Sequence, residues 1–378
     1  MKKTAGIYIH IPFCSVKCMY CDFYSITDRE NDIPIFINSL IKEIELSENS
    51  YNNRWTFDTI FIGGGTPSLL DPKWIQAILN TLSKRFDTTS VKEITMETNP
   101  GEAPLDRLKG YKEIGVNRLS IGFQSFDPDI LKFLDRLHSP EDSLQTFKNA
   151  RLAGFDNINA DLIFNIPGQS LDRWKKDIDH LISMDPEHIS TYSLTVEKGT
   201  PLNSEVKKGN IIMPEEEVDI SMYESGLNAL TDHGYLQYEI SNFSKTDKEC
   251  QHNLHYWNLD PYLSFGPSAH SYNQKKRWWN IRTLDRYLNK ITQNELPIGD
   301  EEVLNNREHF NELLFNGLRL NNGVELKKLE NLFPDKHFSN YLDQHLHRFN
   351  HLIKESGKLK LNQDGRLFAD SIASDMFI

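Results

Sequence analysis

Strand-like and helix-like segments alternate six times in the first half of the chain. The candidate strands are apolar runs at Gly6–Ile11, Thr59–Ile62, Glu93–Glu97, Arg118–Ile121, Ile158–Ile163 and His188–Leu194. The helix-like segments lie at Ile33–Leu46, Pro72–Phe86, Pro104–Ile114, Pro128–Leu134, Pro140–Ala153 and Leu171–Ser183. Proline near several helix starts fits its preference for the first turn. The alternation predicts an α/β fold, a partial, TIM-like (β/α)6 barrel with functional residues at the C-terminal strand ends.

The pattern changes in the second half. We expect a helix at Met213–His233, a strand at Tyr235–Ile240 and an irregular segment, rich in histidine and aromatic residues, over 244–282. Helices are expected at Glu308–Leu318, Glu325–Leu332 and Phe338–Glu355. A hairpin through Asn362–Gly365 would join Lys358–Leu361 to Arg366–Asp370. We therefore divide the chain into a barrel (1–235), an extension (236–299) and a small winged-helix-like domain (300–378).

Three of the four cysteines fall within a short segment after the first candidate strand, at Cys14, Cys18 and Cys21. Such a group does not form a disulfide framework and predicts metal binding in a reducing compartment, here the cytoplasm. Three thiolates can hold three corners of a 4Fe–4S cluster. The fourth iron would then be open to a small molecule, as the free position of a catalytic zinc is.

Polar residues follow or end several of the candidate strands. Gly63-Gly64-Gly65-Thr66 follows the second strand, and its glycines would let the backbone approach a ligand with free N–H and C=O groups. The other polar residues in such positions are Glu97, Gln124, Arg136 and Asp161. Their carboxylate, amide and guanidinium groups can recognise ammonium, hydroxyl and carboxylate groups of a ligand.

Composition excludes few classes of protein. The 378 residues carry a net charge of −12, from 42 basic and 54 acidic side chains, which weakly disfavours a nucleic-acid partner. No apolar stretch approaches the roughly 20 residues of a membrane span. The chain start runs directly into the first strand, so we expect no signal peptide.

The spacing C-x3-C-x2-C resembles that of radical S-adenosylmethionine (SAM) enzymes. With the other motifs in order, the chain resembles the oxygen-independent coproporphyrinogen III oxidase family over nearly its whole length. The resemblance implies a partial six-unit barrel, a C-terminal domain, and a 4Fe–4S cluster on Cys14, Cys18 and Cys21. The SAM-binding residues that it implies are Tyr8, Tyr20, Gly64, Gly65, Thr66, Glu97, Gln124, Arg136 and Asp161.

The family has two branches, the oxidases and the haem chaperones called HemW. The oxidases resemble C-x3-C-x2-C-x-C and carry an N-terminal extension, whereas this chain has Phe23 at the fourth cysteine position and few residues before its first strand. The chaperones share Cys-Asp-Phe and a His-Asn-x-x-Tyr-Trp motif, here His252–Trp257. Because imidazole is a common haem ligand, we predict that His252 contacts haem.

Other residues near this motif suit a porphyrin less specifically. His255 and His270 are further ligand candidates, Arg277 could pair with a propionate, and Cys250 reads more readily as an inert buried thiol. Trp278 and Trp279 suit a hydrophobic core or a stacking wall.

The chaperone branch implies a protein that binds haem, a 4Fe–4S cluster and SAM, receives electrons from a donor and delivers haem to acceptor haemoproteins. Whether SAM is cleaved in that role stays open. The alternative is oxidative decarboxylation of coproporphyrinogen III propionates. A radical-SAM enzyme with another substrate is the third possibility.

Overall fold

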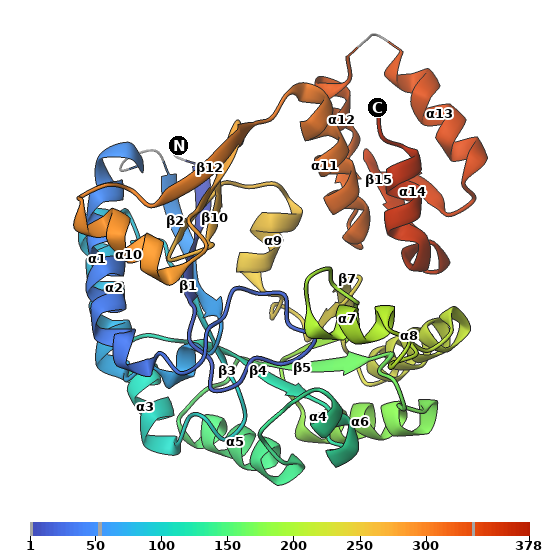
Figure 1. The fold of residues 1–378 in the computed structure, drawn as a ribbon. Helices are drawn as coiled ribbons and strands as arrows, with labels where there is room; N and C mark the ends of the chain where they lie inside the picture. Colours follow the sequence, from blue (N-terminus) through green and yellow to red (C-terminus); the bar gives the residue numbers. More distant parts are fainter. Residues whose placement is uncertain (1–2, 52–54, 335–336) are drawn as a thin grey trace.

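The computed structural model describes residues 3–51, 55–334 and 337–378. A 12-stranded sheet forms its centre, with the order β12-β11-β10-β9-β1-β2-β3-β4-β5-β6-β8-β7. Strands β1 to β6 are parallel and adjacent in chain order. Their helices lie around the outside of a curved, open barrel (Figure 1). The predicted partial barrel is therefore confirmed.

All six predicted strand–helix units are present. The strands are β1 Lys3–Ile11, β2 Trp55–Gly64, β3 Glu93–Thr98, β4 Arg118–Gln124, β5 Ile158–Phe164 and β6 His188–Ser193. The helices are α1 Ile33–Tyr51, α2 Pro72–Arg85, α3 Leu105–Glu113, α4 Pro128–Phe133, α5 Pro140–Leu152 and α6 Leu171–Met184. Short 3-10 helices lie at Glu30–Asp32 and Pro67–Leu69. Proline occupies the first turn of α2, α4 and α5, after a capping aspartate or serine, as the sequence predicts.

Further strands extend both edges of the sheet. Beyond β6, helices α7 Pro201–Lys207 and α8 Glu216–Asp232 lead to the hairpin of β7 Leu236–Glu239 and β8 Asn242–Ser244, which joins β6 antiparallel. The expectation of an irregular segment over 244–282 was wrong. That segment holds α9 Gln251–Trp257, β9 Tyr262–Phe265, β10 His270–Tyr272 and β11 Lys276–Asn280. These elements are too short to give a clear periodicity. Helix α10 Leu284–Thr292 and β12 Ile298–Val303 follow.

The C-terminal unit has the element order of a winged helix. It comprises α11 Asn306–Arg319, β13 Val324–Glu325, α12 Leu326–Leu332, α13 Phe338–Arg348, β14 Leu352–Glu355, β15 Lys358–Leu361 and α14 Ala369–Asp375. The predicted hairpin was misplaced, because β14 and β15 pair around Ser356 and Gly357, whose φ angles are 51° and 77°. The expected helix to Glu355 therefore ends at Arg348, and a 3-10 helix at Asp364–Phe368 replaces the second expected strand.

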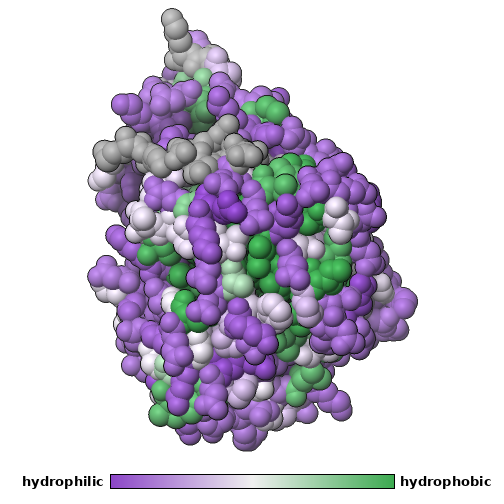
Figure 2. All heavy atoms as spheres, turned by 90° about the vertical axis from the view of Figure 1, so that its left-hand side faces the viewer, coloured by the Kyte–Doolittle hydropathy of each residue, from purple (hydrophilic) through white to green (hydrophobic). Residues whose placement is uncertain are grey.

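The described residues form two large hydrophobic cores. The first surrounds the barrel sheet and includes Leu263, Trp278 and Tyr287 of the predicted extension. The second lies between the helices and the small sheet of the C-terminal unit, with Phe310 and Leu359 fully buried. The face that carries α1, α2 and α10 is mostly hydrophilic, with smaller hydrophobic groups between (Figure 2). The three-part division of the chain stays a prediction.

Candidate functional site

The cysteine loop follows β1 at the C-terminal end of the barrel strands. Its ends are tied together because Cys14 N donates to Ile26 O at 2.9 Å and Ile26 N donates to Pro12 O at 2.8 Å. Its middle is held by other elements, since Met19 N donates to the Asp135 carboxylate at 3.0 Å and Met19 O accepts from Leu202 N at 2.9 Å. These four hydrogen bonds hold the loop at its ends and in its middle.

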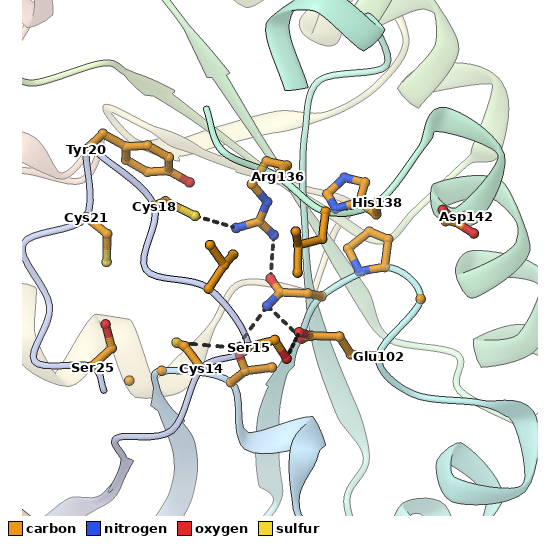
Figure 3. A pocket seen from close by; sticks show the side chains of 18 residues that line it. Cys14, Ser15, Cys18, Tyr20, Cys21, Ser25, Glu102, Arg136, His138 and Asp142 are labelled. Atoms are coloured by element: carbon orange, nitrogen blue, oxygen red, sulfur yellow. Dashed lines mark hydrogen bonds between the residues drawn. The ribbon is translucent and has the colours of Figure 1, made fainter. Parts of the chain in front are cut away.

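All three clustered cysteines line one cavity of about 370 Å³. Cys18 and Tyr20 lie beside Arg136 at one end of the cavity, and Cys14 and Ser25 lie towards the other (Figure 3). Within the described part of the chain, no three His, Cys, Asp or Glu side chains converge as ligands of a single ion. A cubane takes one thiolate per iron at separate corners, and three thiols that line one cavity are the donor set that it needs.

The electrostatics of the three sulfurs differ. Burial raises the pKa of the Cys14 thiol, and it raises the pKa of the Cys21 thiol to about 11. Near Cys18, the Arg136 guanidinium donates to Sγ at 3.8 Å. Because metal ligation requires thiolates, assembly of a cluster here would release protons. The cation beside Cys18 would favour the negative charge that a thiolate-ligated cluster retains.

The glycine segment Gly63–Thr66, which ends β2 and continues beyond it, packs against the cysteine loop. Gly65 N donates to Ile11 O and Thr66 N donates to Phe13 O, both at 2.7 Å. Gly64 N donates to the Glu97 carboxylate at 2.9 Å. The prediction of free N–H groups was therefore wrong: these donors are engaged by the protein. A ligand's ammonium group only donates, so it would bind carbonyl oxygens of the loop and does not depend on these N–H groups.

Arg136 belongs to a polar network on the cavity wall. Its guanidinium donates to Asn99 Oδ1 and, at 3.0 Å, to Gly122 O. Asn99 Nδ2 in turn donates to Thr66 Oγ1 at 2.9 Å and to Glu102 at 2.8 Å. The sequence reasoning gave no role to Asn99 or Glu102. Their position directly after β3, at the edge where functional residues gather, was the available signal.

The predicted SAM residues fall into two groups. Tyr20, Gly64, Gly65, Thr66 and Arg136 line the cavity. Tyr8, Glu97, Gln124 and Asp161 do not line it and lie on β1, β3, β4 and β5.

Glu97 and Asp161 are neighbours within the second group. Burial, opposed by the Gly64 N–H and reinforced by nearby Asp161, raises the pKa of Glu97 to about 7. Burial also raises the pKa of Asp161, which accepts from Asn159 Nδ2 at 2.7 Å. The pair suits a ligand that brings donors or positive charge.

Two sequence models match the chain: the Radical SAM superfamily over residues 8–181 and the HemN C-terminal domain over residues 304–368. The relative named "Heme chaperone HemW" in Bacillus subtilis is 36% identical over 86% of this chain and 88% of its own length. One from Danio rerio, named "Radical S-adenosyl methionine domain-containing protein 1, mitochondrial", is 33% identical over 97% of this chain and 86% of its own length. The chain belongs to the HemW family of radical SAM proteins.

A solved structure shows the same fold at lower identity. Coproporphyrinogen III oxidase, HemN, from Escherichia coli matches with a TM-score of 0.85 over 100% of this chain and 90% of that chain, at 20% identity. The Escherichia coli protein named "Heme chaperone HemW" is 38% identical over 70% of this chain and 69% of its own length. These matches confirm the predicted family and the radical-SAM fold.

The family's His-Asn-x-x-Tyr-Trp motif forms helix α9, which packs against β1 and β2. His252 is fully buried, its Nδ1 lies 2.9 Å from Thr59 Oγ1, and its Nε2 lies 2.9 Å from Tyr256 OH. An axial role would require one of these hydrogen bonds to be exchanged for iron. Haem contact by His252 stays a prediction.

The other two candidate histidines differ in availability. His255 lies between two carboxylates, Asp58 at 2.8 Å and Asp260 at 3.1 Å, which together outweigh burial and raise its pKa to about 9. His270 is exposed at the start of β10 and stacks on Trp279, with ring centroids 5.6 Å apart. No ring nitrogen of His270 has a hydrogen bond within the described residues.

The remaining candidates near the motif are engaged by the protein. Cys250 is fully buried beside Glu93, as its reading as an inert thiol anticipates. Trp278 is buried in the barrel core. Arg277 pairs with Glu302 at 3.2 Å and with Glu312. Among residues 3–51, 55–334 and 337–378, no helix has the length and apolar composition needed to cross a membrane.

Proposed function

We propose that this protein is a radical-SAM haem chaperone, which binds haem and delivers it to acceptor haemoproteins. The observation that carries the proposal is its identity of 33–39% to several proteins named haem chaperone HemW, each over more than two thirds of both chains. None of the four cysteines pairs in a disulfide, and three are grouped as metal ligands, a usage that supports a reducing compartment such as the cytoplasm.

We assign the cluster to Cys14, Cys18 and Cys21, and SAM to the space beside it. When bound, these groups would supply reductive cleavage of a sulfonium carbon–sulfur bond, with an electron from an external donor. Arg136 would hold positive charge at Cys18 and would pair with the carboxylate of SAM. Glu97 and Asp161 would accept from its amino group and ribose hydroxyls, and Tyr20 would pack beside the adenine.

The haem site has two histidine candidates. His252 is the one that the sequence motif indicates, and its ring nitrogens both have protein partners. His270 is exposed at the start of β10, and β10 is separated from β1 only by β9 in the sheet. Trp279, stacked on His270, offers a flat surface for a porphyrin.

The test is a haemin titration of anaerobically reconstituted protein, followed by the Soret band. We compare wild type with His252→Ala, His270→Ala and a control, His233→Ala, on an exposed histidine at the end of α8. Stoichiometric binding that one candidate variant weakens at least tenfold, with the control unchanged, supports the proposal. A wild-type protein that does not bind haemin refutes it.

The oxidase alternative is tested on the same preparation. Protein, reductant and SAM are incubated with coproporphyrinogen III. Formation of protoporphyrinogen would refute the chaperone proposal and support the oxidase alternative. We expect none, because Phe23 stands where the oxidases have a fourth cysteine.

A further inference from the structure

A chain of hydrogen bonds runs through the inside of the barrel from β7 to Asp161. Tyr238 OH lies 2.8 Å from His188 Nε2, and His188 Nδ1 lies 2.6 Å from Asn159 Oδ1. Asn159 Nδ2 then donates to Asp161 Oδ1 at 2.7 Å. Tyr238 also lines a cavity of about 240 Å³ shared with α11 and β13 of the C-terminal unit. This series of hydrogen bonds therefore connects that cavity to Asp161 of the proposed SAM site.

The chemistry of the side chains determines which group donates in each of these hydrogen bonds. Asn159 Oδ1 can only accept, so His188 must carry its proton on Nδ1 and donate. Nε2 of the neutral ring is then an acceptor, and Tyr238 OH donates to it. Burial lowers the pKa of His188 well below its usual value, helped by nearby Arg118, so the ring stays neutral. Every proton in the chain points towards the carboxylate.

Ser190 is the other group that reaches Asn159 Oδ1, at 3.0 Å. Its hydroxyl has one proton and also faces Asn242 Oδ1 at 2.8 Å. Asn242 directs its amide N–H to Glu239, so its oxygen remains an acceptor that needs this proton. His188 Nδ1 is therefore the group whose proton is available for Asn159 Oδ1. Asn159 Nδ2 also donates to Ser120 Oγ at 2.7 Å. Without the His188 donor, Asn159 Oδ1 loses a hydrogen bond that fixes the amide, so its N–H can shift away from Asp161.

We propose that His188 is a positioning residue for SAM binding, which acts by holding the Asn159 amide so that Asp161 is oriented and receives a hydrogen bond. The proposal rests on the assignment of Asp161 to the SAM site. His188 is buried, and it is not among the residues that line the cavity of the three clustered cysteines. Its effect must therefore pass through Asn159.

The experiment measures SAM affinity of the reconstituted protein by equilibrium dialysis. His188→Leu removes the donor, and we expect binding to weaken about tenfold with iron content unchanged. His188→Asn places an amide N–H where Nδ1 stood, and should restore most of the affinity. Tyr238→Phe removes only the hydroxyl that donates to His188 Nε2 and supports the Nδ1–H tautomer, and it should weaken SAM binding about threefold.

Asp161→Asn provides the reference. If it weakens SAM binding while His188→Leu and Tyr238→Phe do not, the inference fails and the proposed site stands. If Asp161→Asn has no effect, the site assignment and the inference both fail. In the double variant His188→Leu/Asp161→Asn, the loss should be that of Asp161→Asn alone. Additive losses would show that His188 acts by another route. If His188→Leu does not fold, Tyr238→Phe and His188→Asn still decide the outcome.

Discussion

The pH dependence of SAM binding should report the ionisation of Glu97. Its carboxylate accepts from Gly64 N at 2.9 Å and lies near Asp161. Burial is the main reason why its pKa rises from 4.5 to about 7, and the like charge of Asp161 adds to the rise. A carboxylic acid with a raised pKa stays protonated up to a higher pH. Its neutral form is a poor partner for an ammonium group.

The magnitude follows from the titration. With a pKa of about 7, Glu97 is about nine-tenths ionised at pH 8 and about one-tenth ionised at pH 6. If only the ionised form binds well, the SAM dissociation constant should rise about tenfold between these two pH values. Asp161→Asn removes a neighbouring negative charge, so the midpoint should move to lower pH.

The assay is equilibrium dialysis of SAM at pH 6, 7 and 8, with iron content checked at each pH. Glu97→Gln is the control, because it keeps the shape of the side chain and cannot titrate. Any pH dependence of SAM affinity that remains in Glu97→Gln arises from SAM itself or from other groups of the protein. A wild-type affinity that is flat over this range, or a Glu97→Gln slope equal to that of wild type, would refute the assignment of Glu97.

Three other predictions concern the cluster loop and the core. Gly65→Ala would place Cβ 2.5 Å from Phe13 O and should cost about 1–3 kcal/mol in urea unfolding while lowering bound iron. Cys18→Ala should keep the fold and lose the broad iron–sulfur absorption; an unchanged iron content would contradict its ligand role. Burial raises the pKa of Glu43 from 4.5 to about 7, so wild type should lose about 3 kcal/mol of unfolding free energy as pH rises through this range. Glu43→Gln should not show that loss.

Local patterns were enough to predict the barrel. Each unit has a short apolar strand and an amphipathic helix, and proline after an aspartate or serine marks the starts of α2, α4 and α5. The C-terminal hairpin was misplaced because Asn362–Gly365 has the composition of a turn. The true turn, Ser356-Gly357, sits between residues that also fit a helix.

Contacts between distant segments could not be read in the same way. The glycine loop has its N–H groups bound to the cysteine loop and to Glu97, a pairing that depends on β1, β2 and β3 being neighbours. Strand β9 pairs with β1 across more than half of the sequence, and its four residues carry no clear pattern. Parallel pairing over such separations is set by tertiary packing.

Helix α9 gives the His-Asn-x-x-Tyr-Trp motif a structural role in the barrel. A mutational test of haem binding must therefore distinguish loss of an iron ligand from loss of barrel structure. Glu93 caps the helix through Gln251 N at 2.9 Å and His252 N at 3.1 Å. A Cβ at Gly6 would lie 2.9 Å from the His252 ring, so the imidazole closes the barrel against the β1 backbone. His252→Ala would leave a cavity and two unpartnered hydroxyls, which together cost about 2–4 kcal/mol. Removing exposed His270 should change stability by less than about 0.5 kcal/mol. Lost haem binding therefore identifies His252 as a ligand only if unfolding shows that the variant barrel is intact.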